Sequence, residues 1–176
     1  MAAFTTSVYQ NFQTLQLTEL LTHYGEIAET WIDIPGVLGP GYREFLYGHV
    51  ARLQPETVVM MNCGIGDGET YDEAYAWPSD LIAIERALPP EKGHRRWREV
   101  GGREHYLPGE VCDPIGKDWF WVEGDAPRPD EKLLEMLQLC RARGTNLLLD
   151  VPPDRHGRIP EPSVQALLRL RKNAGL

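Results

Sequence analysis

The sequence predicts an α/β fold built on a parallel sheet of the α/β-barrel type. Short apolar runs alternate along the chain with segments whose apolar residues recur at helical spacing. Such alternation is typical of a parallel sheet covered by helices. The clearest apolar runs end in a polar residue, in turn Asp33, Asn62, Glu85 and Asp150. Because α/β barrels carry their chemistry at the C-terminal ends of their strands, these four residues are the first candidates for a site.

The first half of the chain has clear start and stop signals. Gly25 ends the first helical pattern, and Pro35 with Gly36 ends the first apolar run. The predicted elements are a helix over 6–24, a strand over 27–34, a helix over 42–53, a strand over 56–62 and a strand over 80–85. A glycine-rich turn over 64–68 follows the second strand. Residues 86–106 are polar and rich in proline and glycine, so they are predicted to be irregular, with the basic run 94–98 as a solvated loop.

The second half continues the alternation up to the C-terminus. Its predicted elements are extended segments over 107–113 and 118–124, a helix over 130–143, a buried strand over 145–151 and a closing helix over 163–173. There is no internal repeat and no low-complexity linker. A length of 176 residues fits one domain of ordinary size, so residues 1–176 are predicted to form a single α/β domain.

Composition excludes several classes of function. Lys and Arg number 18 against 26 Asp and Glu, for a formal net charge of −8, which argues against a nucleic-acid or anionic-membrane surface. The 3 cysteines have no zinc-ligand spacing, and neither a metal nor a cofactor is expected. No apolar run approaches the roughly 20 residues of a membrane span, and no signal peptide is visible. The expectation is a cytoplasmic protein without membrane contact.

The strand-end acids allow two interpretations. A lone acid at the end of a strand often caps the next helix or binds loop amides, and that structural role stays open for Asp33 and for Glu85. Two such acids on neighbouring strands of one cleft indicate a carboxylate pair instead. Glycosidases use such a pair, in which one acid is kept protonated and the other is kept ionised.

Three segments of the chain resemble glycoside hydrolase family 29, the α-L-fucosidases. Residues 16–34, QLTELLTHYGEIAETWIDI, are similar to the family's helix with the pattern ELLTNYG and the following strand that ends W-F-D-G. Residues 79–89, SDLIAIERALP, resemble its G-D-F-x-T-x-E stretch, with Asp80 and Glu85 at the matching spacing. Residues 144–161, GTNLLLDVPPDRHGRIPE, resemble its G-N-L-L-L-N-x-x-P-D-x-x-G-x-I-P motif. The three segments occur in the family's order over most of the chain.

The resemblance implies a retaining α-L-fucosidase that hydrolyses terminal α-L-fucosyl linkages of oligosaccharides or glycoconjugates. Asp33 would be the nucleophile, and Glu85 would be the acid/base. Glu69, Glu73 and Glu110 remain rival candidates for the acid/base. The residues expected to bind the sugar are Trp31, Trp77, Glu110 and Trp119.

The chain departs from the family in two respects. Ile32 and Ile34 stand where the family usually has Phe and Gly around the nucleophile; both are apolar and suit a strand. A full (β/α)₈ barrel takes about 250 residues, so we expect a partial barrel of about four to five parallel strands, resembling the C-terminal half of the catalytic domain. Such a half barrel predicts a homo-oligomer or a separate N-terminal half as partner. The alternative function is a non-catalytic or complementing subunit that needs that N-terminal half for activity.

Overall fold

A computed structural model describes residues 7–62 and 71–176 of the chain. Contacts divide the chain into two compact units. Of the described residues, the first unit comprises 7–62, 71–82 and 97–107, and the second comprises 83–96 and 108–176. Each unit has a hydrophobic core of its own. The expectation of a single domain over 1–176 stays a prediction.

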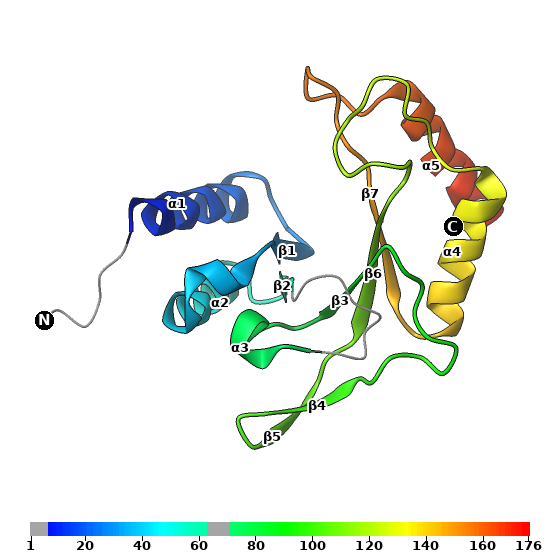
Figure 1. The fold of residues 1–176 in the computed structure, drawn as a ribbon. Coiled ribbons are helices and arrows are strands. Elements are labelled where there is room, and N and C mark those ends of the chain that lie inside the picture. Colours follow the sequence, from blue (N-terminus) through cyan, green and yellow to red (C-terminus); the bar gives the residue numbers. More distant parts are fainter. Residues whose placement is uncertain (1–6, 63–70) are drawn as a thin grey trace, which may run out of the picture. The chain divides into compact units, whose positions relative to one another are not determined.

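The first unit contains a parallel strand pair with helices and a hairpin. Its elements are α1 (Val8–His23), β1 (Glu29–Ile32), the 3₁₀ helix η1 (Pro35–Leu38), α2 (Pro40–Leu53), β2 (Val58–Met61), α3 (Glu73–Ala76), β4 (Trp97–Val100) and β5 (Arg103–Tyr106) (Figure 1). β1 pairs with β2 in parallel, from Glu29 beside Val58 to Ile32 beside Met61. Ser7 and Gln10 form a capping box that fixes the start of α1.

One face of the β1–β2 pair is covered by α1 and α2. Ile32 and Met61 pack there against Leu21 of α1 and against Leu46 and Val50 of α2. Because side chains alternate along a strand, the residues on either side of Ile32 and Met61 point to the opposite face. Trp31, Asp33 and Asn62 therefore belong to the face that these two helices do not cover.

Asp80 holds the following segment against β2. Its Oδ2 accepts the backbone N–H of Val59 at 2.8 Å, and its Oδ1 accepts the hydroxyl of Tyr47 at 2.6 Å. Burial, together with the hydrogen bond and the charge of Asp80, raises the pKa of Tyr47 to about 12. Asp80, which matches the family's G-D-F segment, thus has a structural role in this unit.

The second unit is a three-stranded sheet with two helices on one face. Its elements are β3 (Ile82–Glu85), β6 (Gly109–Pro114), α4 (Asp130–Ala142), β7 (Asn146–Asp150) and α5 (Glu161–Asn173), and the strand order is β3-β6-β7. β6 and β7 are parallel, and α4 and α5 lie on one side of them (Figure 1). Ile84 and Val111 pack with Cys140 of α4, so this face of the sheet is core.

The structure confirms a mixed α/β fold with parallel strands, and it corrects three expectations. Residues 86–106 are not irregular throughout, because β4 and β5 form an antiparallel hairpin within them. Residues 118–124, predicted to be extended, contain no strand. The basic run is not a solvated loop, because His94 and Arg98 are buried. The predicted turn over 64–68 and Cys63 lie outside the described residues, and the partial barrel stays a prediction.

In the part of the chain that the structure describes, no helix has both the length and the apolar character needed to cross a membrane. The same residues contain no group of three His, Cys, Asp or Glu side chains arranged to hold a metal ion.

Candidate active site

Asp33 follows β1 directly and is held by two hydrogen bonds to one of its oxygens. Asn62 Nδ2 donates to Asp33 Oδ1 at 2.8 Å, and the backbone N–H of Ile34 donates to the same oxygen at 2.9 Å. The predicted strand over 27–34 therefore ends before Asp33, and the carboxylate stands at the C-terminal end of β1. This position agrees with a functional role at a strand end, and it also shows that Asp33 does bind a loop amide.

Ile34 adopts a left-handed backbone conformation, with φ 50° and ψ 47°. The expectation that Ile34 suits a strand is therefore wrong. A β-branched residue rarely adopts this region, because its side chain crowds the backbone. The resembling family has glycine here, which adopts the conformation without that penalty. In this chain the turn after the candidate nucleophile forms without a glycine.

We expect Ile34→Gly to raise the free energy of unfolding by up to about 1 kcal/mol. Relief of the left-handed Cβ contributes roughly 1–2 kcal/mol, and the greater freedom of glycine in the unfolded chain offsets part of it. Little burial is lost, since Ile34 is 53% exposed. Val37→Gly is the matched control, because Val37 is also exposed but has no positive φ, and it should destabilise. Urea unfolding of both variants measures the difference, and equal losses would contradict the assigned strain.

A hollow of about 410 Å³ lies between α1 and the edge of β1. Its lining includes Trp31 and Asp33, and also Leu17 and Ile32, which belong to the core between helix and strand. The hollow therefore extends past the edge of β1 onto the side that α1 covers. Among the described residues, β1 pairs only with β2, so its other edge carries no strand.

Glu85 ends β3 in the second unit, on the face of the sheet opposite the core. Ile84 points into the core under α4, so the neighbouring Glu85 points away from it. The backbone N–H of Arg86 donates to Cys112 O at 3.2 Å, which places Glu85 beside β6. Arg86 has φ 51°, so Glu85, like Asp33, is followed by a left-handed residue that is not glycine.

Two more carboxylates share this face of the sheet with Glu85. The register of β6 and β7 puts Glu110 beside Asn146 and puts Asp150 at the end of β7. Burial, with the charges of Glu85 and Glu110 as the next causes, raises the pKa of the Cys112 thiol between them to about 12. The unit therefore carries a strongly acidic sheet face around Cys112.

The environments of these acids differ. Glu110 is 1% exposed and accepts Asn146 Nδ2 at 2.7 Å, so it is fixed within the sheet. Burial raises the pKa of Asp150, whose Oδ2 is buried without a hydrogen-bond partner among the described residues. Asp150 is among the strand-end acids of the sequence, but it is not among the predicted rivals of Glu85. Its signal was visible, because the strand over 145–151 ends on it.

The tryptophans predicted to bind sugar lie in different surroundings. Trp31 shares the hollow with Asp33. The guanidinium of Arg86 lies 4.7 Å from the ring centroid of Trp119 and also donates to Lys117 O, so one face of the indole is already covered. Trp77 contacts the ring of His105 edge-on at 4.6 Å and lines a separate cavity of the first unit, without Asp33. Its role in sugar binding stays a prediction.

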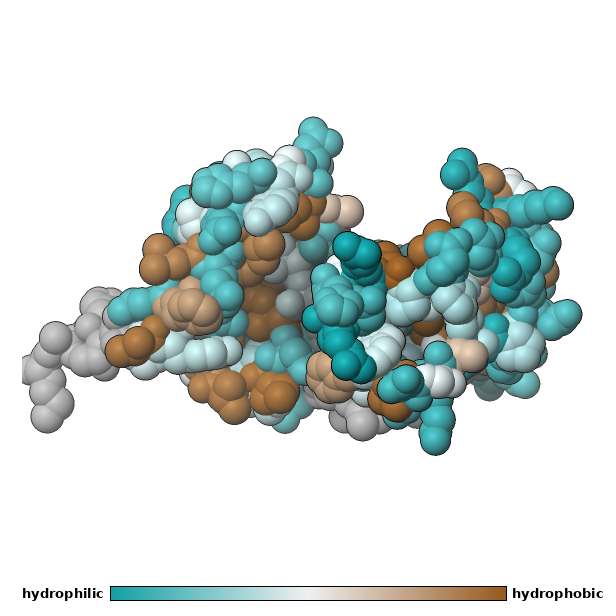
Figure 2. Space-filling model, turned by 90° about the horizontal axis from the view of Figure 1, so that it is seen from above, coloured by the Kyte–Doolittle hydropathy of each residue, from teal (hydrophilic) through white to brown (hydrophobic). Residues whose placement is uncertain are grey.

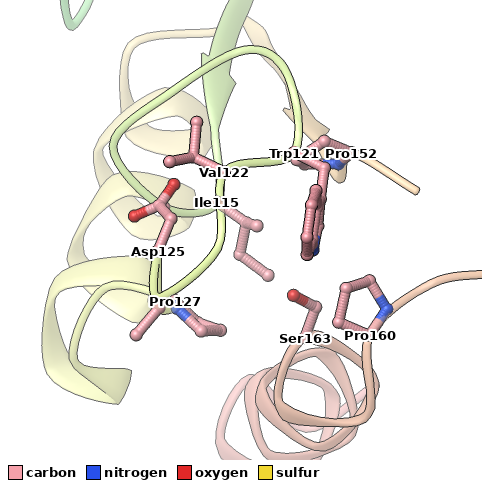
Figure 3. Close-up of a pocket in the computed structure, with 10 residues that line it drawn as sticks. Ile115, Trp121, Val122, Asp125, Pro127, Pro152, Pro160 and Ser163 are labelled. Atoms are coloured by element: carbon pink, nitrogen blue, oxygen red, sulfur yellow. The ribbon is translucent and has the colours of Figure 1, made fainter. Parts of the chain in front are cut away.

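A small pocket in the second unit is lined by Trp121, Pro152, Pro160 and Ser163 among others (Figure 3). Asp125 lines it too, and its carboxylate accepts the backbone N–H groups of Lys117 and Asp118. With a volume of about 20 Å³, the pocket has room for roughly one water molecule and none for a sugar. Asp125 thus holds the backbone directly before Trp119.

The model of the family described as Alpha-L-fucosidase matches residues 2–172. The chain belongs to the α-L-fucosidase family. Alpha-L-fucosidase 1 of Arabidopsis thaliana is 30% identical over 170 residues, in an alignment that covers 90% of this chain and 33% of the relative. Putative alpha-L-fucosidase 1 of Oryza sativa subsp. japonica is 26% identical, with 92% of this chain and 33% of the relative covered. The chain thus spans about a third of the length of these α-L-fucosidases.

Solved α-L-fucosidases share the fold of this chain. Alpha-L-fucosidase isoenzyme 1 from Paenibacillus thiaminolyticus superposes with a TM-score of 0.71 at 24% identity, and 99% of this chain and 42% of that chain are covered. Alpha-L-fucosidase AlfC from Lactobacillus casei, solved with its α-L-fucose product, gives a TM-score of 0.65 at 23% identity. In that pair 92% of this chain and 44% of the other are covered. At these identities the likeness concerns the fold.

Proposed function

We propose that this chain carries the catalytic carboxylates of a retaining α-L-fucosidase, with Asp33 as the nucleophile and Glu85 as the acid/base. Membership of the α-L-fucosidase family supports the activity and the substrate class, which is terminal α-L-fucosyl groups on oligosaccharides or glycoconjugates. The resemblance of the segments around Asp33 and Glu85 to the family motifs supports the two assignments. Both residues stand at strand ends, where α/β barrels carry their chemistry.

Both candidate acids are followed directly by a strained residue. Among the described residues, Ile34 and Arg86 are the two non-glycine residues with positive φ, and they follow Asp33 and Glu85 directly. A left-handed non-glycine residue costs roughly 1–3 kcal/mol, and such strain clusters at functional sites, where it fixes the geometry of a reacting group. The coincidence of strain with both candidate acids would be unexplained if they were ordinary strand-end residues.

The proposed reaction has two steps. Asp33 attacks the anomeric carbon of fucose while Glu85 protonates the departing glycosidic oxygen, which leaves a fucosyl ester on Asp33. Glu85 then removes a proton from water, which attacks the same carbon and releases fucose with retained configuration. Retaining glycosidases need the two carboxyl groups about 5–5.5 Å apart. Trp31 and Trp119 are the aromatic side chains proposed to pack on the apolar face of the sugar.

Glu85 is preferred over its rivals on structural grounds. Glu110 is buried and bound to Asn146, so it is poorly placed to exchange protons with a leaving group. Glu73 lies in the first turn of α3, next to the N-cap residue Asp72, where an acid stabilises the helix terminus. Glu69 lies outside the described residues. Asp150 joins Glu85 as a candidate on the same sheet face.

The Glu85 assignment is tested with substrates of different leaving groups. We expect Glu85→Ala to lower the rate of hydrolysis of a fucosylated disaccharide by about 10²–10⁴-fold, because its leaving group needs protonation. The rate of hydrolysis of 4-nitrophenyl α-L-fucoside should fall far less, because 4-nitrophenolate leaves without a proton. Asp150→Asn is the matched variant. If Asp150→Asn showed this selective loss and Glu85→Ala slowed both substrates equally, Asp150 would take the role of the acid.

We also propose that a second polypeptide surface completes the site, as a homo-oligomer or as a complementing N-terminal half. Two observations support this. On α1 the side chains of Val8, Phe12 and Leu15 are 86%, 55% and 69% exposed, and hydrophobic side chains appear in brown at the surface in Figure 2. The hollow beside β1 contains the buried Gln13 Oε1, which has no hydrogen-bond partner among the described residues.

Light scattering tests the assembly. We expect a mass at least twice the 20.0 kDa of one chain, because an exposed apolar row on a helix is stabilised by burial at roughly 25 cal/mol/Å². Phe12→Glu should shift the mass towards the monomer, while Glu19→Gln, on the same helix, should not. A stable monomer that hydrolyses fucosides would contradict both forms of assembly.

A further inference from the structure

The side chain of Asn62 lies directly beside the candidate nucleophile. The backbone N–H of Asn62 donates to Ile32 O at 2.9 Å, which continues the pairing of β1 and β2 by one residue. Asn62 and Asp33 thus extend neighbouring parallel strands at the same level and on the same face. Asn62 is 4% exposed, so its carboxamide has little freedom to turn away.

The orientation of the Asn62 amide follows from its partner. An ionised carboxylate can only accept hydrogen bonds, so the nitrogen of the carboxamide must face Asp33 and its oxygen must face elsewhere. Asn62 Nδ2 lies 2.8 Å from Asp33 Oδ1 in this orientation. Because the donor contacts the charged form of Asp33, the hydrogen bond is of the stronger, charge-assisted kind.

Both donors to Asp33 converge on one oxygen. Oδ1 accepts from Asn62 Nδ2 and from the N–H of Ile34, while Oδ2 accepts no hydrogen bond from the described residues. Two donors, one that follows β1 and one that follows β2, fix the plane of the carboxylate. The peptide that joins Asp33 to Ile34 supplies one of them, and Ile34 turns the chain in a left-handed conformation directly after it.

We propose that Asn62 is a positioning residue for the nucleophile, which holds Oδ1 so that Oδ2 is the attacking oxygen. The inference rests on the proposed function, in which Asp33 forms the fucosyl ester. Oδ2 forms the bond to the anomeric carbon, the bond from that carbon to the leaving oxygen breaks, and its electron pair takes the proton of Glu85. Oδ1 becomes the carbonyl oxygen of the ester and keeps both donors. When water displaces the ester, the same donors stabilise the returning carboxylate.

The inference predicts a kinetic effect that depends on the presence of Asp33. In the wild-type background, Asn62→Ala should lower kcat for 4-nitrophenyl α-L-fucoside by about 10- to 100-fold, with little change in KM. In the Asp33→Gly background, where azide replaces the carboxylate, Asn62→Ala should leave the azide-supported rate unchanged within about twofold. A residue that only supports the fold would lower both rates by the same factor.

Two further variants keep the test decisive. Asn62→Leu preserves the branched shape of the side chain but has no hydrogen-bond donor. It is used in place of Asn62→Ala if circular dichroism shows that Asn62→Ala does not fold. Ser79→Ala is the control, because Ser79 Oγ accepts the N–H of Met61, so this variant removes a buried hydrogen bond to β2 without touching Asp33. It should leave kcat unchanged.

The outcomes separate this inference from the proposed function. If Asp33→Gly abolishes turnover but Asn62→Ala and Asn62→Leu fold and keep the wild-type kcat, the positioning role is wrong and the function stands. Equal losses in the wild-type and Asp33→Gly backgrounds would also overturn the positioning role. If Asp33→Gly itself keeps the wild-type rate, the proposed function fails at its nucleophile.

Discussion

Asp33→Gly is expected to lower the turnover of an aryl α-L-fucoside by at least about 10⁴-fold, because no other group forms the covalent intermediate when the nucleophile is missing. The fold should survive, since the Asp33 carboxylate accepts hydrogen bonds at the end of a strand and is not part of the core. Azide fits the space that the side chain leaves. It should restore part of the rate and yield a fucosyl azide of inverted configuration, which nuclear magnetic resonance identifies.

Asp130→Gly is the control for this prediction. Asp130 is a surface carboxylate that binds Arg169 at 2.6 Å, and the hydrogen bond to Arg169 is the main cause that lowers its pKa. Its loss should cost little stability and no activity, and azide should have no effect on it. If both glycine variants kept near wild-type rates, the nucleophile would have to be another residue.

Arg43→Leu is expected to lower the free energy of unfolding by roughly 3 kcal/mol, the largest stability effect that we predict. Arg43 is 2% exposed, and its guanidinium donates to three backbone carbonyls, those of Pro35, Ala74 and Trp77. Leucine would leave these acceptors without their donor inside the first unit. Because Pro35 opens the helix that follows Asp33 and Ile34, the loss should also loosen the turn at the candidate nucleophile.

Urea unfolding followed by circular dichroism measures this loss. Arg52→Leu is the matched control, since Arg52 lies on the same helix α2 but is exposed, and it should change stability by no more than about 0.5 kcal/mol. The loss of unfolding free energy in Arg43→Lys should lie between those of the two leucine variants. Lysine keeps the charge, but it lacks the planar guanidinium that donates to three carbonyls. Equal midpoints for Arg43→Leu and Arg52→Leu would show that the three hydrogen bonds do not stabilise the fold.

The sequence predicted the long elements well because their patterns are strong. α4 and α5 have apolar residues at helical spacing, and β7 contains the apolar run 147–149 directly before Asp150. The hairpin β4–β5 was missed because its residues are mostly polar. Its Gly101–Gly102 loop was a usable signal, since two glycines between alternating residues are typical of a tight hairpin.

The site was predictable as a set of residues and not as an arrangement. Asp33, Glu85 and Asp150 were visible as polar ends of apolar runs. The left-handed turn at Ile34 was not, because local propensity favours a strand for isoleucine and tertiary contacts override it. The contact of Asn62 with Asp33 depends on the register of β1 against β2, and strand register follows from pairing that spacing along one chain does not reveal.

The role of Asp33 is tested most directly by trapping its ester. A 2-fluorinated fucosyl fluoride reacts with a retaining enzyme to give a long-lived fucosyl ester, because the fluorine at C2 destabilises the oxocarbenium-like transition state of hydrolysis. Mass spectrometry of the digested chain should then find a single adduct, on the peptide that contains Asp33, and none in Asp33→Gly. An adduct on Glu85 or on another acid, or hydrolysis with inverted configuration and no adduct, would contradict the assignment.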